Sequence, residues 1–249
     1  MSARGAALVT GAGQRIGRAI ALRLAQAGFD VAVHYRSDPD AAEAVVAEIE
    51  ALGRRAVAVQ VELTDEARAR ALVAEAAGAL GPLTVLVNSA STFEDDRAGR
   101  LGRETWDRHF ETNLRAPLVL AEAFAEQAGE GACVVNLLDQ RVWKLTPQFF
   151  SYALSKSALW TATRMLAQAW APRIRVNGVG PGPTLASVHQ SEADFEAEAR
   201  GTLMGRPVDP EEIAEAVLYL VDAPSVTGQM IAVDAGQHLG WRTPDIQEP

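Results

Sequence analysis

The sequence predicts an α/β protein built as a doubly wound parallel sheet with helices on both faces. Short, continuously apolar runs alternate with longer helical stretches along nearly all of the 249 residues. Apolar residues make up 48% of the composition and charged residues 22%, as in soluble globular domains. Strands that are apolar on both faces and alternate with helices are typical of parallel sheets joined by crossovers. We therefore expect residues 1–249 to form a single domain.

The first part of the chain contains three expected strand–helix pairs. The apolar runs that predict strands are residues 6–10, 29–35 and 56–61. The stretches that predict helices are residues 15–27, 40–52 and 65–79. The first of these is amphipathic, and the second is rich in Ala, Glu and Val. Their alternation predicts right-handed crossovers between parallel strands.

The rest of the chain continues the pattern with longer helices. The expected strands are residues 83–88, 132–138, 173–178 and 230–233. The expected helices are residues 104–128, with a bend near Pro117, residues 150–170, which stop at Pro172, and residues 211–221, which begin at Pro210. Residues 180–209 hold several prolines and lie between a strand and a helix. A connection of this length predicts a substrate-binding loop or lid.

Charge, cysteine content and hydropathy argue against several kinds of binding partner. The formal net charge is −9, and no run of Lys or Arg exceeds two residues, so we expect no nucleic-acid partner. The single Cys133 excludes an internal disulfide, and no Cys/His cluster has the spacing of metal ligands, so we expect no metal. No apolar run approaches the roughly 20 residues of a membrane helix, and the N-terminus lacks a signal pattern. These features predict a cytoplasmic protein without a membrane partner.

A glycine-containing loop joins the first expected strand to the first expected helix. Gly11 permits a tight turn, and Gly17 permits close packing of the helix on the sheet. Backbone N–H groups at the helix start can bind a pyrophosphate. The usual G-x-G-x-x-G pattern is not matched, because its third glycine would fall on Ile16. An ordinary strand–helix turn is the alternative, but the position in the first crossover favours a dinucleotide site.

The end of the second expected strand predicts which dinucleotide binds. An Asp or Glu there would bond the ribose 2′-hydroxyl of NAD. The chain has Arg36 and Ser37 instead, which can hold a 2′-phosphate, and Arg15 adds a second cation. We therefore expect NADP(H), with a solvated surface arginine as the alternative role of Arg36.

Tyr152 and Lys156 lie four residues apart on one expected helix and so share a face. An ammonium beside a phenol is expected to lower the phenol pKa from about 10. This makes Tyr152 a candidate proton donor to a group that receives hydride. Lysine occurs only at Lys144 and Lys156, so a lysine four residues after a tyrosine is improbable by chance.

These motifs resemble the short-chain dehydrogenase/reductase family over about residues 5 to 240, in order and in spacing. The residues that carry the resemblance are Thr10, Gly11, Gly17, Asn88, Ser89, Ala90, Asn113, Tyr152, Lys156, Pro181 and Gly182. The resemblance implies a Rossmann-type subunit, usually in a homotetramer, that transfers hydride from a nicotinamide. It also implies that Tyr152 is the acid, that Lys156 binds the ribose and shifts the pKa of the tyrosine, and that Asn113 anchors a proton-relay water. The implied cofactor contacts are Gly11, Arg15, Ile16, Gly17, Arg36, Ser37, Glu62, Leu63, Asn88, Ala90, Lys156, Pro181 and Gly182.

Departures from the family pattern resemble its pteridine reductase branch, which includes bacterial dihydromonapterin reductases. Asp139 stands where the family usually has a serine, and Arg15 replaces a loop glycine. The resemblance implies that Asp139 works with Tyr152 in proton delivery and that Phe93 stacks a pterin against the nicotinamide. It further implies that Arg15 and Ser91 contact the cofactor phosphates and the pterin. Ser89 replaces a more usual asparagine, and Glu62 replaces an aspartate that typically meets the adenine.

These observations favour an NADPH-dependent reductase of a small planar substrate, such as a dihydropterin. A flat pterin suits an aromatic platform such as Phe93, although Phe93 could instead be a packed core residue. One alternative function is a ketone or aldehyde reductase with the same cofactor, and another is a non-catalytic NADP-sensing protein.

The helix 150–170 carries Trp160, Met165 and Trp170 beyond its catalytic face, which predicts a homo-oligomer, expected to be a tetramer.

Overall fold

Seven parallel strands form the central sheet, in the order β3-β2-β1-β4-β5-β6-β7. The computed structural model describes residues 4–186 and 190–241. The strands are β1 (Ala6–Val9), β2 (Asp30–Tyr35), β3 (Ala56–Gln60), β4 (Leu83–Asn88), β5 (Ala132–Leu137), β6 (Ile174–Pro181) and β7 (Met230–Val233). The strand order reverses direction between β1 and β4, which both pair in parallel. The predicted doubly wound fold is therefore confirmed.

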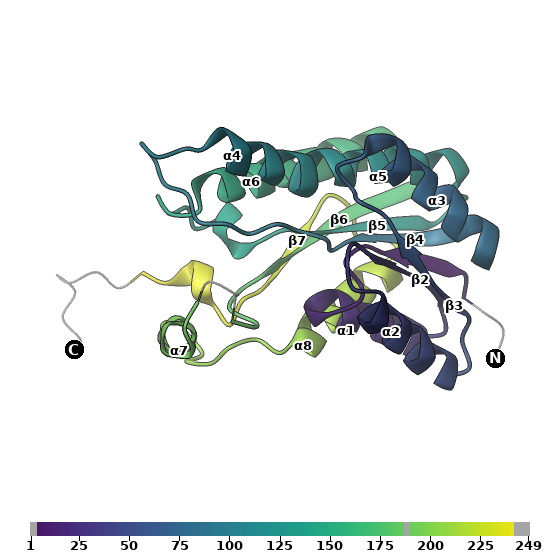
Figure 1. Cartoon of the computed structure of the whole chain (residues 1–249), viewed down its shortest axis with the longest axis horizontal. Coiled ribbons are helices and arrows are strands. Elements are labelled where there is room, and N and C mark those ends of the chain that lie inside the picture. Colours follow the sequence, from purple (N-terminus) through teal and green to yellow (C-terminus); the bar gives the residue numbers. More distant parts are fainter. Residues whose placement is uncertain (1–3, 187–189, 242–249) are drawn as a thin grey trace.

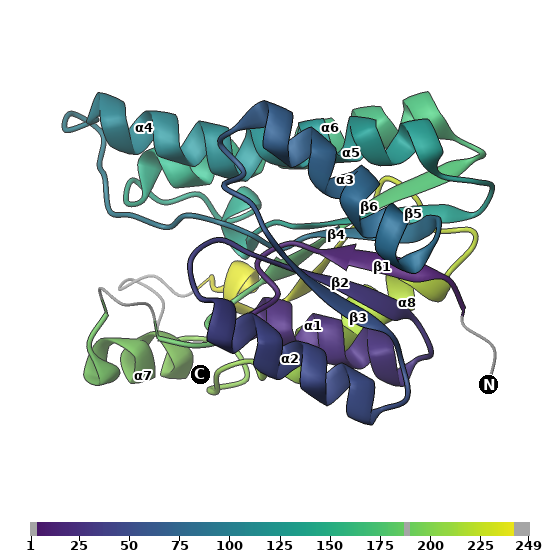
Figure 2. The ribbon, with the colours of Figure 1, turned by 45° about the vertical axis from the view of Figure 1, so that its right-hand side comes forward.

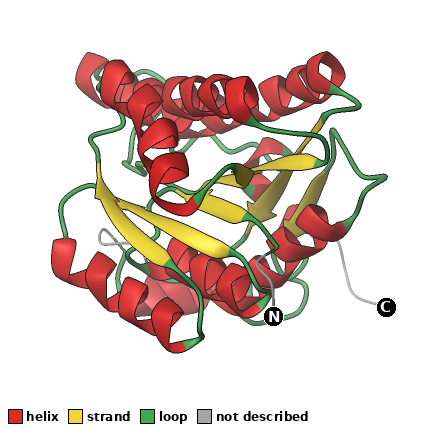
Figure 3. Cartoon of the chain, turned by 90° about the vertical axis from the view of Figure 1, so that its right-hand side faces the viewer, coloured by secondary structure: helices red, strands yellow, loops and turns green. Residues whose placement is uncertain are grey.

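Helices cover both faces of this sheet. One face carries α1 (Arg15–Gln26), α2 (Pro39–Ala51) and α8 (Pro210–Asp222), and the other carries α3 (Glu66–Leu80), α4 (Arg103–Phe110), η1 (Glu111–Arg115), α5 (Ala116–Gln127) and α6 (Phe150–Trp170). Figure 1 shows the two helical layers above and below the strands, and Figure 2 shows the same layers after a turn. Figure 3, turned by 90° from the view of Figure 1, shows the twist of the sheet between the two helical layers. The remaining elements are α7 (Glu192–Arg200), η2 (Gln140–Val142) and η3 (Gln237–Leu239).

Strand residues alternate between two cores. Ala7 and Val9 of β1 pack with α1, α2 and α8, whereas Ala6 and Leu8 pack with α3 and α5. All four are at most 2% exposed, because helices cover both faces of the central strand. This burial explains why the strand sequences are apolar throughout rather than alternating.

Three elements differ from the sequence-based expectation. The helix predicted over residues 104–128 is interrupted by the π-helical turn η1, and Pro117 lies in the first turn of α5, directly after that turn. Strand β6 continues to Pro181 because Gly180 and Pro181 still pair with β7. Residues 180–209 contain a helix, α7, that was not predicted.

Among the described residues, no helix is long and apolar enough to cross a membrane.

Candidate active site

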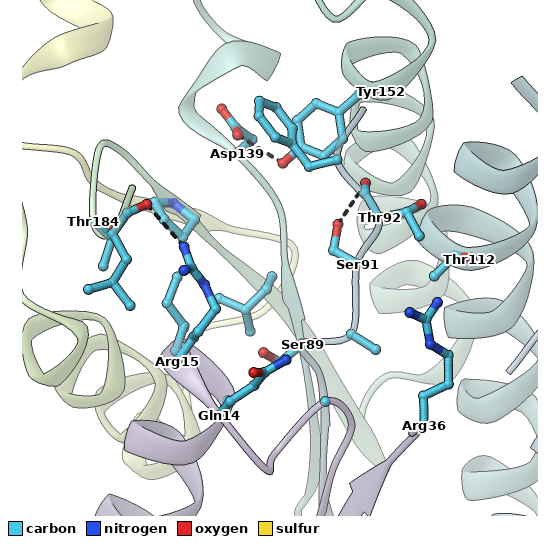
Figure 4. Close-up of a pocket in the computed structure, with 18 of the residues that line it drawn as sticks. Gln14, Arg15, Arg36, Ser89, Ser91, Thr92, Thr112, Asp139, Tyr152 and Thr184 are labelled. Carbon is cyan, nitrogen blue, oxygen red and sulfur yellow. Dashed lines mark hydrogen bonds between the residues drawn. The ribbon is translucent and has the colours of Figure 1, made fainter. Parts of the chain in front are cut away.

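A cavity of about 780 Å³ opens at the carboxyl ends of the strands. The segments that follow β1, β2, β3, β4, β5 and β6 all contribute to its lining (Figure 4). The cavity therefore lies beside the point between β1 and β4 where the strand order reverses, which is the general ligand position in open α/β sheets.

The glycine loop has the geometry of an anion-binding turn. Gly11 has a φ of +64°, and a Cβ on Gly17 would lie 2.1 Å from the Gly11 carbonyl oxygen, so the approach of helix to loop requires glycine. His34 secures the turn, because its Nδ1 accepts the Gly11 N–H at 3.0 Å and its Nε2 donates to the Val61 carbonyl at 3.0 Å. Helix α1 begins here without a side-chain cap, so its first N–H groups are available to a ligand.

Arg15 takes a role that the sequence did not predict. It adopts a left-handed φ of 53°, where glycine is the more usual residue. Its guanidinium donates at 3.0 Å to the carbonyl oxygens of Leu185 and Ala186 across the cavity. In this structure Arg15 therefore ties the loop after β6 to the phosphate loop, while it still lines the cavity as expected.

The residues after β2 and β3 line the end of the cavity expected to hold the adenosine. Arg36 and Ser37 are exposed and line it, and the Arg36 guanidinium has no partner among the described side chains. Asp38 is occupied as the N-cap of α2, where its carboxylate accepts the Ala41 N–H at 3.0 Å. Glu62 and Leu63 also line the cavity. Asp38, the acidic residue nearest the end of β2, is therefore not available to bind a ribose 2′-hydroxyl.

Two predicted residues lie behind the cavity rather than on its surface. Asn88 is 2% exposed, and its amide donates to the Asn136 side chain at 2.8 Å. Asn113 is fully buried in η1, where its Oδ1 accepts the Thr92 N–H at 2.8 Å and the Ser91 hydroxyl at 3.0 Å. Both side chains therefore support cavity walls: Asn88 the strand β4, and Asn113 the segment that carries Ser91.

Tyr152, Asp139 and Lys156 meet at the centre of the cavity. The Tyr152 hydroxyl donates to the Asp139 carboxylate at 2.9 Å, and Lys156 Nζ donates to the Leu137 carbonyl at 2.7 Å. Burial raises the pKa of Tyr152 well above its usual value, and the charge of Asp139 raises it further. The expectation of a lowered tyrosine pKa is therefore wrong here, because desolvation and the neighbouring carboxylate outweigh the Arg141 guanidinium, which opposes the shift. Burial also lowers the pKa of Lys156 to about 8.

Phe93 forms an aromatic wall of the same cavity. Its ring stacks on Phe149 with centroids 4.3 Å apart and meets Tyr152 edge-on at 4.7 Å. Ser91 lies beside it in the same segment, with its hydroxyl held by Asn113. The structure thus brings Ser91, Phe93, Asp139 and Tyr152 to one cavity, as expected.

The segment after β6 closes one side of the cavity. Pro181 and Gly182 line it, and a Cβ on Gly182 would lie 2.6 Å from the Cα of Asp234, so only glycine fits there. Sequence reasoning missed several other lining residues, among them Thr92, Glu94, Arg108 and Arg141. Segment 180–209 was predicted only as a whole, and the structure adds Thr184, Leu185, Gln190, Phe195 and Glu198 of that segment to the lining. Arg141 lies 3.5 Å from Asp139 and 3.6 Å from Glu198 of α7. Its place two residues after Asp139 is the one signal that could have identified it.

The fold and the site define a nucleotide-binding oxidoreductase with a tyrosine–lysine pair. Residues 11–238 match the family model described as Enoyl-(Acyl carrier protein) reductase. The chain belongs to the short-chain dehydrogenase/reductase family. It is 36% identical over 239 residues to an uncharacterized oxidoreductase of Methylorubrum extorquens, covering 92% of this chain and 96% of that one.

Two further relatives carry names that describe an activity. One is the 3-oxoacyl-[acyl-carrier-protein] reductase FabG of Staphylococcus aureus, 32% identical over 94% of this chain and 98% of the relative. The other is the structure of FolM Alternative dihydrofolate reductase 1 from Brucella canis complexed with NADP. That structure is 48% identical, covers 99% of both chains and has a TM-score of 0.94. The resemblance to a pteridine-reductase-like branch is thus confirmed, and the family is one of NADP-dependent oxidoreductases.

Proposed function

We propose that the protein is an NADPH-dependent reductase of a small planar substrate of the dihydropterin type. The observation that carries the proposal is the 2.9 Å hydrogen bond between Tyr152 and Asp139 in the cavity that Phe93 lines. A carboxyl group beside the tyrosine can hold and pass a proton, whereas a serine in its place could only donate or accept a hydrogen bond. The similarity to the Brucella reductase supports the same assignment.

The residues present fit NADP(H). The loop at Gly11 and Gly17 leaves room for a pyrophosphate against the start of α1, because a Cβ on Gly17 would clash with the loop. We propose that Arg36 and Ser37 hold the 2′-phosphate; both line the cavity, and Asp38 is engaged elsewhere. Lys156 also lines the cavity, and its ammonium is proposed to donate to a ribose hydroxyl. When bound, NADPH supplies the hydride.

Proton delivery falls to Tyr152 and Asp139. Because its pKa is raised by burial and by Asp139, Tyr152 keeps its proton at neutral pH and can donate it to a ring nitrogen beside the reduced carbon. Asp139 accepts that hydroxyl in the free protein, and after the donation its carboxylate can relay a proton from water to the phenolate. The Arg141 guanidinium lies 3.5 Å from the same carboxylate.

The shape of the cavity supports a flat substrate. Phe93 is held by the stack on Phe149 and by the edge contact with Tyr152, so it presents a fixed ring surface to the cavity. Segment 180–209 is proposed as the substrate-binding loop or lid, with Leu185, Phe195 and Glu198 on the cavity surface; residues 187–189 of the segment lie outside the described residues. Ser91 and Arg15 are proposed as the polar contacts to substrate and cofactor.

A ketone or aldehyde reductase is the second candidate function, because the FabG relatives are named for reduction of a carbonyl. NADPH oxidation, followed by absorbance, decides between the two. The assay compares dihydrobiopterin, dihydromonapterin, dihydrofolate and a panel of ketones. Turnover of dihydropterins well above that of ketones supports the proposal, and turnover of ketones alone contradicts it. NADPH binding without turnover of any compound would instead indicate an NADP-sensing protein.

Assembly and location follow from the same proposal. We propose a homotetramer in the cytoplasm. Of the three apolar residues noted on α6, Met165 is 63% exposed, whereas Trp160 and Trp170 are half-buried against the core. Leu154 is a further exposed apolar residue on this helix. An apolar face of this kind supports a helix-to-helix contact between copies.

A further inference from the structure

A buried chain of polar side chains lies beside the candidate site and takes no part in the chemistry proposed above. It consists of Asp96, Ser151 and His109, which come from the segment after β4, from α6 and from α4. Asp96 is 6% exposed, and Ser151 and His109 are fully buried. Buried polar side chains lower the free energy of unfolding unless their hydrogen-bonding groups have partners inside the protein.

The direction of each hydrogen bond follows from the backbone groups at the ends. The Glu94 N–H can only donate, and it lies 3.1 Å from His109 Nε2, so that nitrogen is an acceptor. The proton of the neutral ring is therefore on Nδ1, which donates to the Ser151 hydroxyl at 2.7 Å. The Ser151 hydroxyl in turn donates to the Asp96 carboxylate. A serine whose proton is directed at an aspartate, out of contact with solvent, is not an activated nucleophile.

One end of this chain caps the helix that carries Tyr152. Helix α6 begins after Phe149, which has a left-handed φ of 52° and provides no side-chain cap. The Asp96 carboxylate accepts the Ser151 N–H at 3.0 Å instead, so the cap comes from a distant segment. The Phe150 N–H also donates to the Asp96 carbonyl at 3.2 Å. The start of α6 is therefore held by the segment after β4.

The other end holds the segment that carries Phe93. His109 accepts the N–H of Glu94, the residue directly after Phe93. The His109 ring also meets Tyr152, with centroids 5.9 Å apart. Figures 1 and 2 show α4 lying beside α6. Through these bonds α4 ties the position of the aromatic wall to the start of the helix that carries the proton donor.

We propose that His109, with Ser151 and Asp96, is a positioning unit that sets Phe93 against Tyr152 and so determines affinity for the planar substrate. The identity of that substrate rests on the function proposed above. None of the three residues lines the cavity, so they act through Phe93 and Tyr152 rather than by contact. Loss of the unit should affect substrate binding more than cofactor binding, because the phosphate loop lies on other elements.

Two substitutions of His109 test the proposal. His109→Leu removes both bonds, whereas in His109→Gln the side-chain oxygen can still accept the Glu94 N–H. We expect His109→Leu to raise the KM for dihydropterin about tenfold or more, with the KM for NADPH changed less than about twofold. His109→Gln should recover most of this loss. The control is Val73→Ala, a core truncation in α3 remote from the cavity, which lowers stability without touching the unit.

Amide hydrogen exchange of the protein without ligands gives a second measurement that needs no turnover. In His109→Leu the N–H groups of Glu94 and Ser151 should lose protection together, whereas Val73→Ala should leave their relative protection unchanged. If only Glu94 loses protection, or if both KM values rise equally, the positioning role is wrong. If the wild type reduces no dihydropterin, the proposed function fails, but the exchange experiment still decides whether His109 couples the two segments.

Discussion

Arg36 and Ser37 are the residues on which the cofactor preference depends. We expect Arg36→Ala to weaken NADPH binding by about 1.5–3 kcal/mol, the range for a hydrogen bond to a charged group, and to leave NADH nearly unchanged. Titration of both cofactors by fluorescence measures this. Arg18→Ala is a matched control, because Arg18 is an exposed arginine of α1 that pairs with Glu48 outside the cavity. Equal losses for NADPH and NADH would exclude the 2′-phosphate assignment.

Asp139 is the residue that separates the two candidate reductases. We expect Asp139→Ser to lower kcat for dihydropterin by about 10²-fold or more, the usual range for lost acid catalysis. The backbone should change little, because Asp139 caps η2 by accepting the Arg141 N–H at 2.7 Å and serine is also a good N-cap.

The informative quantity for Asp139→Ser is the ratio of dihydropterin to ketone turnover, compared with that of the wild type. The ratio should fall, since ketone reduction needs only the serine hydroxyl and Tyr152. A parallel fall of both activities, or no change, would make Asp139 a structural carboxylate.

At the residue scale, the sequence predicted which residues belong to the site better than it predicted their burial and their neighbours. The spacing of Tyr152 and Lys156 was sufficient to place both in the cavity. The direction of the Tyr152 pKa shift was wrong, because burial and the nearness of Asp139 depend on the whole fold. Asn113 was found by its motif, yet its bonds to the segment carrying Ser91 depend on the π-helical turn η1, which no local pattern indicated.

At the element scale, apolar strands and amphipathic helices were predictable, and polar elements were not. Strand β7 and helix α6 begin and end at the expected residues. Helix α7 was missed because Ala199 is its only fully buried residue, so it lacks an apolar stripe that a sequence can show. Its position over the cavity, fastened through Glu198 to Gln237 at 2.9 Å, is set by tertiary contacts.

The junction of the phosphate loop with α1 provides a test at the scale of the element. We expect Gly17→Ala to lower the free energy of unfolding by about 1–3 kcal/mol or more, because the new Cβ would meet the Gly11 carbonyl at 2.1 Å. Gly13→Ala is the matched control, since its Cβ would make only an ordinary 3.5 Å contact with Ala42. Urea denaturation of both variants measures the difference, and equal stability would show that the loop can yield.

For the whole molecule, the exposed apolar residues on α6 predict assembly. We expect light scattering at micromolar concentration to give the mass of a tetramer, with Met165→Glu shifting it toward smaller species because it places a charge on the apolar face. Arg164→Glu, a change on the same helix at an exposed site, controls for charge alone. A monomeric wild type would contradict this prediction.

Stability of the whole molecule should depend on two buried histidines. Burial lowers the pKa of both His34 and His109; for His109, Asp96 and Glu94 oppose the shift, while Arg108 and Lys156 reinforce it. The unfolded chain therefore binds protons more readily than the native protein below about pH 6.5. The contribution of the two neutral histidines to the free energy of unfolding should be fully present above that pH. It should be lost as the pH falls from there through the lowered pKa values of the native protein.

Thermal unfolding between pH 7.5 and 5.5 checks this expectation, with His109→Gln expected to flatten the dependence. The Glu212 carboxylate does not mask the effect in this range. Hydrogen bonding to Arg206 lowers the pKa of Glu212 to about 2, so that its contribution is lost only in stronger acid. A melting temperature independent of pH across the range would count against the buried neutral histidines.

The strand order has a consequence for how the chain reaches its native state. Strand β1, an inner strand of the sheet, pairs with β2 on one side, with Ala6 beside Asp30, and with the distant β4 on the other, with Ala6 beside Leu83. Each pairing in the sheet is parallel and must wait for a crossover helix, so contacts are far apart in sequence and refolding is expected to take milliseconds to seconds. During synthesis, the half of the sheet ending at Asn88 exposes an unpaired apolar edge until residues 132–137 emerge. That interval is when the nascent chain is most prone to self-association.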